Sequence, residues 1–142
     1  MYSRSLVFAQ FFLIALMAVY SRGIFSSWLG LSVLLAGVLF GLWAMNYNKL
    51  GNFNIRPELK AGCYLVTTGP YRFVRHPMYT SVMLMTLGMA LSTPTYMEWS
   101  SFVLLMLVLA LKAVREERLW CADNESYKAY MKESKRFIPF IY

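Results

Sequence analysis

The sequence has little charge and few of the residues that soluble catalytic sites use most often. Only 15% of its 142 residues are charged, and it has one histidine and two cysteines. Soluble domains are about a quarter charged, so the composition argues against a soluble domain. Cys63 and Cys121 stand far apart and form no CxxC or other ligand pattern. We therefore expect neither a metal site nor a disulfide.

Motifs for nucleotide binding and zinc hydrolysis are also missing. The chain has no GxGxxG, GxxxxGK or HExxH segment. It is too short to hold several membrane helices and a separate Rossmann-type domain. We expect a single membrane domain, residues 1–142, with two spans in residues 1–50 and the functional residues in 51–142.

Apolar residues are abundant, at 58%, and they gather in long runs. Residues 5–21, 23–48 and 76–97 are uncharged, and a fourth run, 99–114, carries only Lys112 near its end. A helix needs about 20 residues to span a bilayer, so the first run is at the short limit. The last run is short and could span by tilting, by thinning the bilayer locally or by snorkelling of Lys112. The sequence predicts an all-α integral membrane protein with about four transmembrane helices.

Basic residues outnumber acidic ones by 14 to 7. Because they flank apolar runs, they indicate topology and anionic membrane lipid rather than nucleic acid. With four spans and both termini in the cytoplasm, only Arg22 would lie outside. The basic residues on the cytoplasmic side would be Arg4, Lys49, Arg56, Lys60, Arg72, Arg75, Lys112, Arg115, Arg118, Lys128, Lys132, Lys135 and Arg136.

Residues 67–81, TTGPYRFVRHPMYTS, form a polar cluster between two apolar runs. Proline suits the first turn of a helix, so Pro77 predicts a helix start with His76 at or near the N-cap. The free N–H groups there, with Arg72, Arg75 and His76, would attract a carboxylate or phosphate. Tyr79 lies three residues after His76 and can share its face. The competing interpretation is an arginine anchor and an aromatic belt at the membrane border.

Residues 111–120, LKAVREERLW, form a second cluster. Lys112, Glu116 and Trp120 follow one another at four-residue spacing and can line one helix face. Carboxylates oppose the dipole at a helix C-terminus, so either the helix continues past Glu116 and Glu117 or they are held for another reason. A solvated face of mixed charge is the competing interpretation.

Together the clusters predict a cytoplasmic pocket for a zwitterionic ligand. Its carboxylate would lie at His76 and its ammonium at Glu116 or Glu117, and aromatic faces suit a further cationic group. S-adenosylmethionine has all three features, and a phospholipid headgroup also fits. The C-terminal segment, ESYKAYMKESKRFIPFIY, predicts an interfacial amphipathic helix that ends before Pro139.

Three stretches, LVTTGPYRFVRHPMYTS, EERLW and YKAYMKESKRFIPF, resemble the C-terminal half of the isoprenylcysteine carboxyl methyltransferase and phospholipid methyltransferase superfamily. The resemblance covers residues 65–142. It implies that 51–142 is the methyltransferase-like half of an integral membrane enzyme that uses S-adenosyl-L-methionine. The expected cofactor-binding residues are Cys63, Tyr64, Leu65, Val66, Tyr71, Arg75, His76, Pro77, Met78, Tyr79 and Glu116.

The resemblance also indicates the acceptor side of the site. The carboxyl-methylating branch places an arginine one turn before the glutamate, where this chain has Lys112, with Arg115 nearby. Lysine lacks the planar fork of arginine. We expect Lys112, Arg115 and Glu117 to serve catalysis on a lipophilic acceptor that enters from the bilayer. The acceptor group stays open between a carboxylate, an amine and a thiol.

Two other functions remain open at this point. Membrane sterol and steroid reductases are similar in this region and use NADPH, whose phosphates Arg72, Arg75 and Arg136 could bind. A small non-enzymatic membrane protein with a vestigial pocket is the other alternative. A bundle of this size is compatible with a homo-oligomer.

Overall fold

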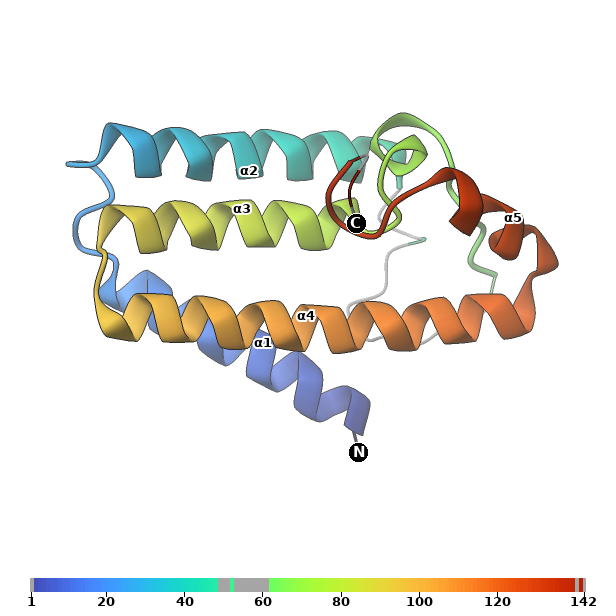
Figure 1. Ribbon diagram of the computed structural model, residues 1–142, viewed down its shortest axis with the longest axis horizontal. Helices are drawn as coiled ribbons and strands as arrows, with labels where there is room; N and C mark the ends of the chain where they lie inside the picture. The colour runs from blue at the N-terminus through green and yellow to red at the C-terminus, as the bar shows by residue number, and fades with distance from the viewer. Residues whose placement is uncertain (1, 49–51, 53–61, 140, 142) are drawn as a thin grey trace.

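The computed structural model describes residues 2–48, 52, 62–139 and 141. Four long helices form a bundle, and the shorter elements gather at one end of it (Figure 1). Lys49, Arg56 and Lys60, which we predicted to be cytoplasmic, lie outside the described residues. The elements are α1 (Tyr2–Tyr20), α2 (Trp28–Tyr47), η1 (Gly69–Arg72), α3 (Pro77–Ser92), α4 (Tyr96–Asp123) and α5 (Glu125–Glu133).

All regular elements in the described part of the chain are helical, as predicted, whereas the count of four spans stays a prediction. Among the described residues, three helices are long and apolar enough to cross a membrane: α1, α2 and α4. At 16 residues, α3 is about 24 Å long, which is less than the hydrocarbon thickness of about 30 Å. Helix α4 is longer than predicted, with 28 residues, because it continues past Glu116 and Glu117 without a break.

Small residues bring α2 and α3 together. Gly30, Gly37 and Gly41 are buried on α2, and the hydroxyl of Ser81 on α3 donates to the Gly37 carbonyl at 2.7 Å. A Cβ at Gly37 would lie 2.7 Å from the backbone nitrogen of Met85. Apolar side chains gain nothing by leaving lipid for protein, so close backbone packing is what holds such helices together.

Helix α1 packs against α4 along a stripe that repeats every three or four residues. Its buried residues are Ser3, Leu6, Gln10, Leu13 and Met17. The facing part of α4 buries Ser101, Leu105, Leu109, Lys112 and Ala113. In the middle of this otherwise mainly apolar contact, the Lys112 ammonium donates to the Gln10 side-chain oxygen at 2.5 Å.

The C-terminal helix is shorter than the segment for which it was predicted. Helix α5 ends at Glu133, and the chain then runs alongside the residues before α3, with one parallel bridge between Val74 and Lys135. The Arg75 N–H donates to the Lys135 carbonyl at 2.7 Å, and the Lys135 N–H donates to the Phe73 carbonyl at 3.0 Å. The prediction of a helix that ends before Pro139 is confirmed, and the helix ends already at Glu133 because residues 134–136 bond to another segment.

The α2–α3 contact predicts an effect of volume at Gly37. A leucine there has no space against the Met85 backbone, and overpacking costs about 1–3 kcal/mol. We expect Gly37→Leu to lower the thermal unfolding midpoint of the detergent-purified protein by several degrees. Ala36→Leu is the matched control, since Ala36 is exposed on the outer face of the same helix. Equal midpoints for the two variants would contradict this packing.

Candidate functional site

A sharp turn in the chain before α3 places His76 at the start of that helix. Gly69 has a φ of +60° in this turn, and a Cβ there would lie 2.6 Å from the Tyr47 ring. Both facts require glycine. His76 is the N-cap residue of α3, as predicted, and Pro77 opens its first turn. The His76 side chain is buried at this end of the bundle.

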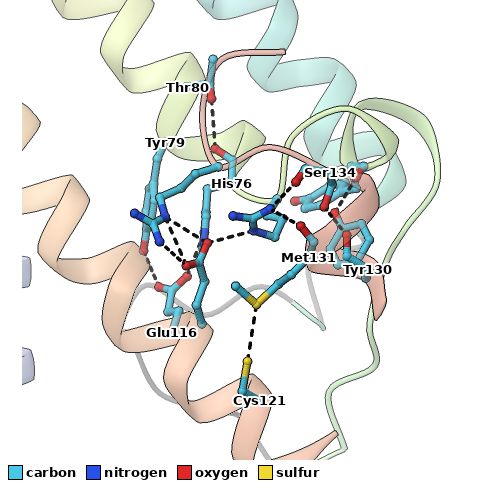
Figure 2. A network of polar contacts seen from close by, with 12 residues as sticks. His76, Tyr79, Thr80, Glu116, Cys121, Tyr130, Met131 and Ser134 are labelled. Carbon is cyan, nitrogen blue, oxygen red and sulfur yellow. Dashed lines mark hydrogen bonds and ion pairs between the residues drawn. The ribbon is translucent and has the colours of Figure 1, made fainter. Parts of the chain in front are cut away.

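Glu117 on α4 is the centre of a buried ion-pair cluster, and the neighbouring His76, Tyr79 and Glu116 side chains are labelled in Figure 2. Its carboxylate lies 2.9 Å from Nε of Arg75 and 2.7 Å from Nη2 of Arg136. The third partner is Nε2 of His76, at 3.3 Å. Only 5% of the Glu117 side chain is exposed, so three separate segments of the chain meet at one carboxylate that has little access to water.

Glu116 occupies the more accessible side of the cluster. Its carboxylate lies 3.4 Å from Nδ1 of His76 and accepts a hydrogen bond from the Tyr79 hydroxyl. The His76 and Tyr79 rings stack with centroids 5.4 Å apart, which confirms that the two residues share a face. One fifth of the Glu116 side chain is exposed. Of the two glutamates, Glu116 is therefore the one that a ligand can reach.

The surroundings of His76 favour its protonated form. Burial lowers the pKa of the imidazole, but hydrogen bonds to Glu116 and Glu117 and their negative charges outweigh it and raise the pKa above 6.5.

The Arg75 guanidinium also donates to the carbonyls of Met131 and Ser134. The C-terminal segment is thus fastened to the same cluster through Arg75.

The segment from Cys63 to Val66 is linked to Tyr71 through the side-chain amides of Asn52 and Asn48. Asn52 donates to the Tyr64 carbonyl at 2.9 Å and accepts from the Tyr64 N–H at 2.8 Å. Asn52 also donates to Asn48 at 2.7 Å, and Asn48 is hydrogen-bonded to Tyr71. Burial raises the pKa of the Tyr71 hydroxyl to about 12, against the effect of Asn48.

The remaining predicted residues occupy different positions. Tyr64 is half exposed, whereas Cys63, Leu65, Val66 and Met78 are partly buried and Pro77 is buried.

On α4, Lys112 is 1% exposed, with its ammonium over the Tyr79 ring at 5.1 Å from the centroid. Arg115 is partly buried on the same helix. The arginines that pair with Glu117 are Arg75 and Arg136 instead.

Several residues of the site were missed or misjudged from the sequence. Arg136 was considered only as a phosphate ligand, although it pairs with Glu117. Asn48, Asn52 and Gln10 were not identified. The signal for Gln10 was a polar residue within an apolar span, which in membrane proteins commonly marks a polar partner inside the bundle.

Fold and site together define a helical membrane protein with a cluster of paired charges at one end of its bundle. A family model described as phospholipid methyltransferase matches residues 25–123, which is more than half of the chain. The chain belongs to this family of membrane methyltransferases. The matched part includes α2, α3 and α4 and ends before α5. Comparison with curated proteins gives no significant match.

The Glu117 cluster predicts a large loss of stability in Glu117→Gln. Removing one member of a buried ion pair leaves the other charge uncompensated, which costs about 3–5 kcal/mol. We expect the variant to unfold at a clearly lower temperature in detergent. Glu133→Gln, on the exposed C-terminal turn of α5, is the control and should melt as the unaltered protein does. An unchanged midpoint for Glu117→Gln would show that the cluster does not hold the fold.

The raised pKa of His76 gives a second prediction. Because the folded value exceeds 6.5, the stability that His76 contributes is complete below pH 6.5 and is lost as the pH rises through the folded pKa. His76 is the only histidine, so histidine-labelled protein gives one imidazole signal by NMR. We expect its titration midpoint above 6.5, and a midpoint at or below 6.5 would contradict the described contacts.

Proposed function

We propose that the protein transfers a methyl group from S-adenosyl-L-methionine to a lipophilic acceptor. The observation that carries this proposal is that two adjacent carboxylates of α4 lie beside the start of α3 and differ in their access to solvent. Glu117 is closed off by Arg75, Arg136 and His76, whereas Glu116 is partly open. Membership of a methyltransferase family supports the same conclusion.

The donor set fits the zwitterionic cofactor that the family implies. The open carboxylate of Glu116 would receive the ammonium group, and the positive end of α3 would attract the carboxylate. The Tyr79 ring lies beside Glu116 and has the Lys112 ammonium over it, an arrangement in which an aromatic ring attracts a cation. Tyr71, Pro77 and Met78 flank this position in the chain, and Cys63, Tyr64, Leu65 and Val66 would line the nucleoside portion.

The bound cofactor supplies a methyl group on a sulfonium, which needs little further activation. The protein's own residues then have to align the reactants and keep water out. Tyr79 and His76 are buried and suit both tasks. Glu117 has both oxygens in ion pairs, so we assign it the role of holding Arg75, His76 and Arg136 in place rather than that of a general base.

The acceptor would approach from the bilayer, on the side of the site where Lys112 and Arg115 lie. A carboxylate acceptor needs no base, whereas an amine or a thiol has to lose a proton. Lysine can bind a phosphate or a carboxylate as a point charge, which suits an acceptor with an anionic group. The excess of basic residues at this end supports an orientation with both termini in the cytoplasm.

The reductase alternative receives less support. A nicotinamide cofactor would need cations for its phosphates, but Arg75 and Arg136 are engaged by Glu117 and Arg72 is exposed on η1. The alternative of a non-enzymatic protein predicts that neither nucleotide binds. Direct titration separates the three.

We expect the detergent-purified protein to bind S-adenosylhomocysteine saturably and NADPH not at all in calorimetric titration. Glu116→Gln should weaken S-adenosylhomocysteine binding by about tenfold or more, because the ammonium loses its counter-charge. Glu133→Gln, which is exposed and lies outside the cluster, should bind normally.

Each contrary result has a distinct meaning. Binding of NADPH alone would replace the proposal by the reductase alternative. If the folded protein bound neither compound, the non-enzymatic alternative would stand. Normal binding by Glu116→Gln would remove Glu116 from the site.

A further inference from the structure

Glu98 is a buried carboxyl group at the end of the bundle opposite the Glu117 cluster. It stands in the first turn of α4, at the end where α4 follows α3 and where the connection between α1 and α2 also lies (Figure 1). At 1.5 Å per residue, Glu117 lies about 28 Å further along the same helix. None of the surface of Glu98 is exposed, and the proposed methyl transfer does not involve it.

Neither carboxylate oxygen of Glu98 has a hydrogen-bond partner within the described part of the chain. A Thr-x-x-Glu sequence at a helix start commonly forms a capping box, in which the glutamate accepts from the N–H of the N-cap residue. Only half of that box forms here. The Thr95 hydroxyl accepts from the Glu98 N–H at 3.3 Å, but the Thr95 N–H donates to the Thr93 carbonyl at 2.7 Å. Capping therefore leaves the carboxyl group unpaired.

The helices packed against this part of α4, α1 and α3, offer Glu98 no positive charge. Residues 5–19 and 80–92 contain no charged or titratable side chain. Along α4 the next charged side chain is that of Lys112, about 21 Å away at 1.5 Å per residue. The titratable and charged side chains of the adjoining turns are all exposed: Tyr20, Arg22 and Tyr96.

These surroundings suit a neutral carboxylic acid better than a carboxylate. A charged group that is buried without hydrogen-bond donors is among the most costly arrangements in a protein. The positive end of α4 favours the charged form, but this influence is weaker than that of the hydrogen bonds to water that burial removes. The neutral acid also has an O–H group of its own, which can donate to a carbonyl.

We infer that Glu98 is a proton-binding site, occupied in the folded bundle, whose deprotonation loosens α1 and α3 from the start of α4. The O–H bond breaks, the proton passes to water and a carboxylate remains. Because Glu98 is fully buried, water can hydrate this carboxylate only if the helix ends separate. This site is independent of the proposed methyl transfer.

The contacts that join the two connections at this end are suited to such a change. The Gly23 N–H donates to the Thr93 hydroxyl at 3.1 Å, and the Ser21 hydroxyl donates to the Met89 carbonyl at 3.5 Å. Both are single hydrogen bonds between neutral groups, and the second is long. They contrast with the ion pairs of Glu117 at the other end.

Thermal unfolding of the detergent-purified protein between about pH 5 and about pH 9 tests the site. Folding keeps a proton that an unfolded glutamate releases at about pH 4.3, so the stability of the unaltered protein should fall as the pH rises. Glu98→Gln replaces the neutral acid by a neutral amide of the same shape. We expect its unfolding midpoint to gain several degrees on that of the unaltered protein between the two pH values. His76 is present in both proteins, so its own titration cancels in the comparison.

Infrared spectroscopy gives a readout that a purely structural role of Glu98 would not change. A protonated carboxylic acid absorbs at a higher frequency than a carboxylate, and exposed carboxyl groups are ionised at about pH 7. We expect the unaltered protein to show a protonated-acid band that Glu98→Gln lacks. Glu133→Gln, on the exposed end of α5, is the matched control, and it should keep both the band and the pH dependence of the unaltered protein.

Three results would each overturn the inference. The first is a pH dependence of unfolding that is the same in the unaltered protein and in Glu98→Gln. The second is the absence of the protonated-acid band. The third is a stability that depends on sodium, potassium or calcium ions in the unaltered protein alone, because Glu98 would then be an ionised cation ligand.

If Glu98→Gln does not fold, Glu98→Met takes its place with the same expectations, since its side chain needs no hydrogen bond. Failure of both variants to fold would show that the fold requires the charged carboxylate, which would also contradict a protonated Glu98. Failure of the unaltered protein to bind S-adenosylhomocysteine bears on the proposed methyl transfer and leaves these measurements unaffected.

Discussion

The fold at the functional end depends on a single buried carboxylate. Glu117 on α4 holds Arg75 and His76 from the segment before α3 and Arg136 from the C-terminal segment. Burying charges is costly, and only good geometry with several partners compensates for it. Two segments distant in sequence are thereby fixed against one helix. The stacking of His76 on Tyr79 and the parallel run of residues 134–136 both depend on this arrangement.

The adjacent glutamates have two different tasks, to hold the cluster together and to remain accessible to a ligand, and one carboxylate could not perform both. Successive residues on an α-helix point about 100° apart, so Glu117 faces the cluster while Glu116 reaches its edge. A carboxylate saturated by cations is a good structural centre and a poor ligand for another cation. Glu116, with one fifth of its side chain exposed, remains available to a ligand. This division accounts for the pair better than two equivalent acids would.

Local sequence rules predicted the parts of the fold that depend on local chemistry. Pro77 marked the start of α3, and the apolar runs marked α1, α2 and α4. Those rules failed where contacts between residues distant in sequence determine the conformation or the partner of a residue. No residue near Arg136 in the sequence indicates that it pairs with Glu117. The sequence of residues 134–136 suits a helix, but in the structure Lys135 is hydrogen-bonded to Phe73 and Arg75. Gln10 takes its role from Lys112 and Asn48 from Tyr71. Both partners are far away in the chain, so one sequence read locally could not reveal them.

We propose that this cluster is a methyl-transfer site for a lipophilic acceptor. Its most direct test is to incubate the purified protein with S-adenosylmethionine labelled in its methyl group and with membrane lipid extract. The products are then separated into organic and aqueous phases. We expect label in the organic phase, in an amount that grows with time and with protein concentration. Folded protein that leaves the organic phase unlabelled across lipid extracts and prenylated cysteine compounds would contradict it.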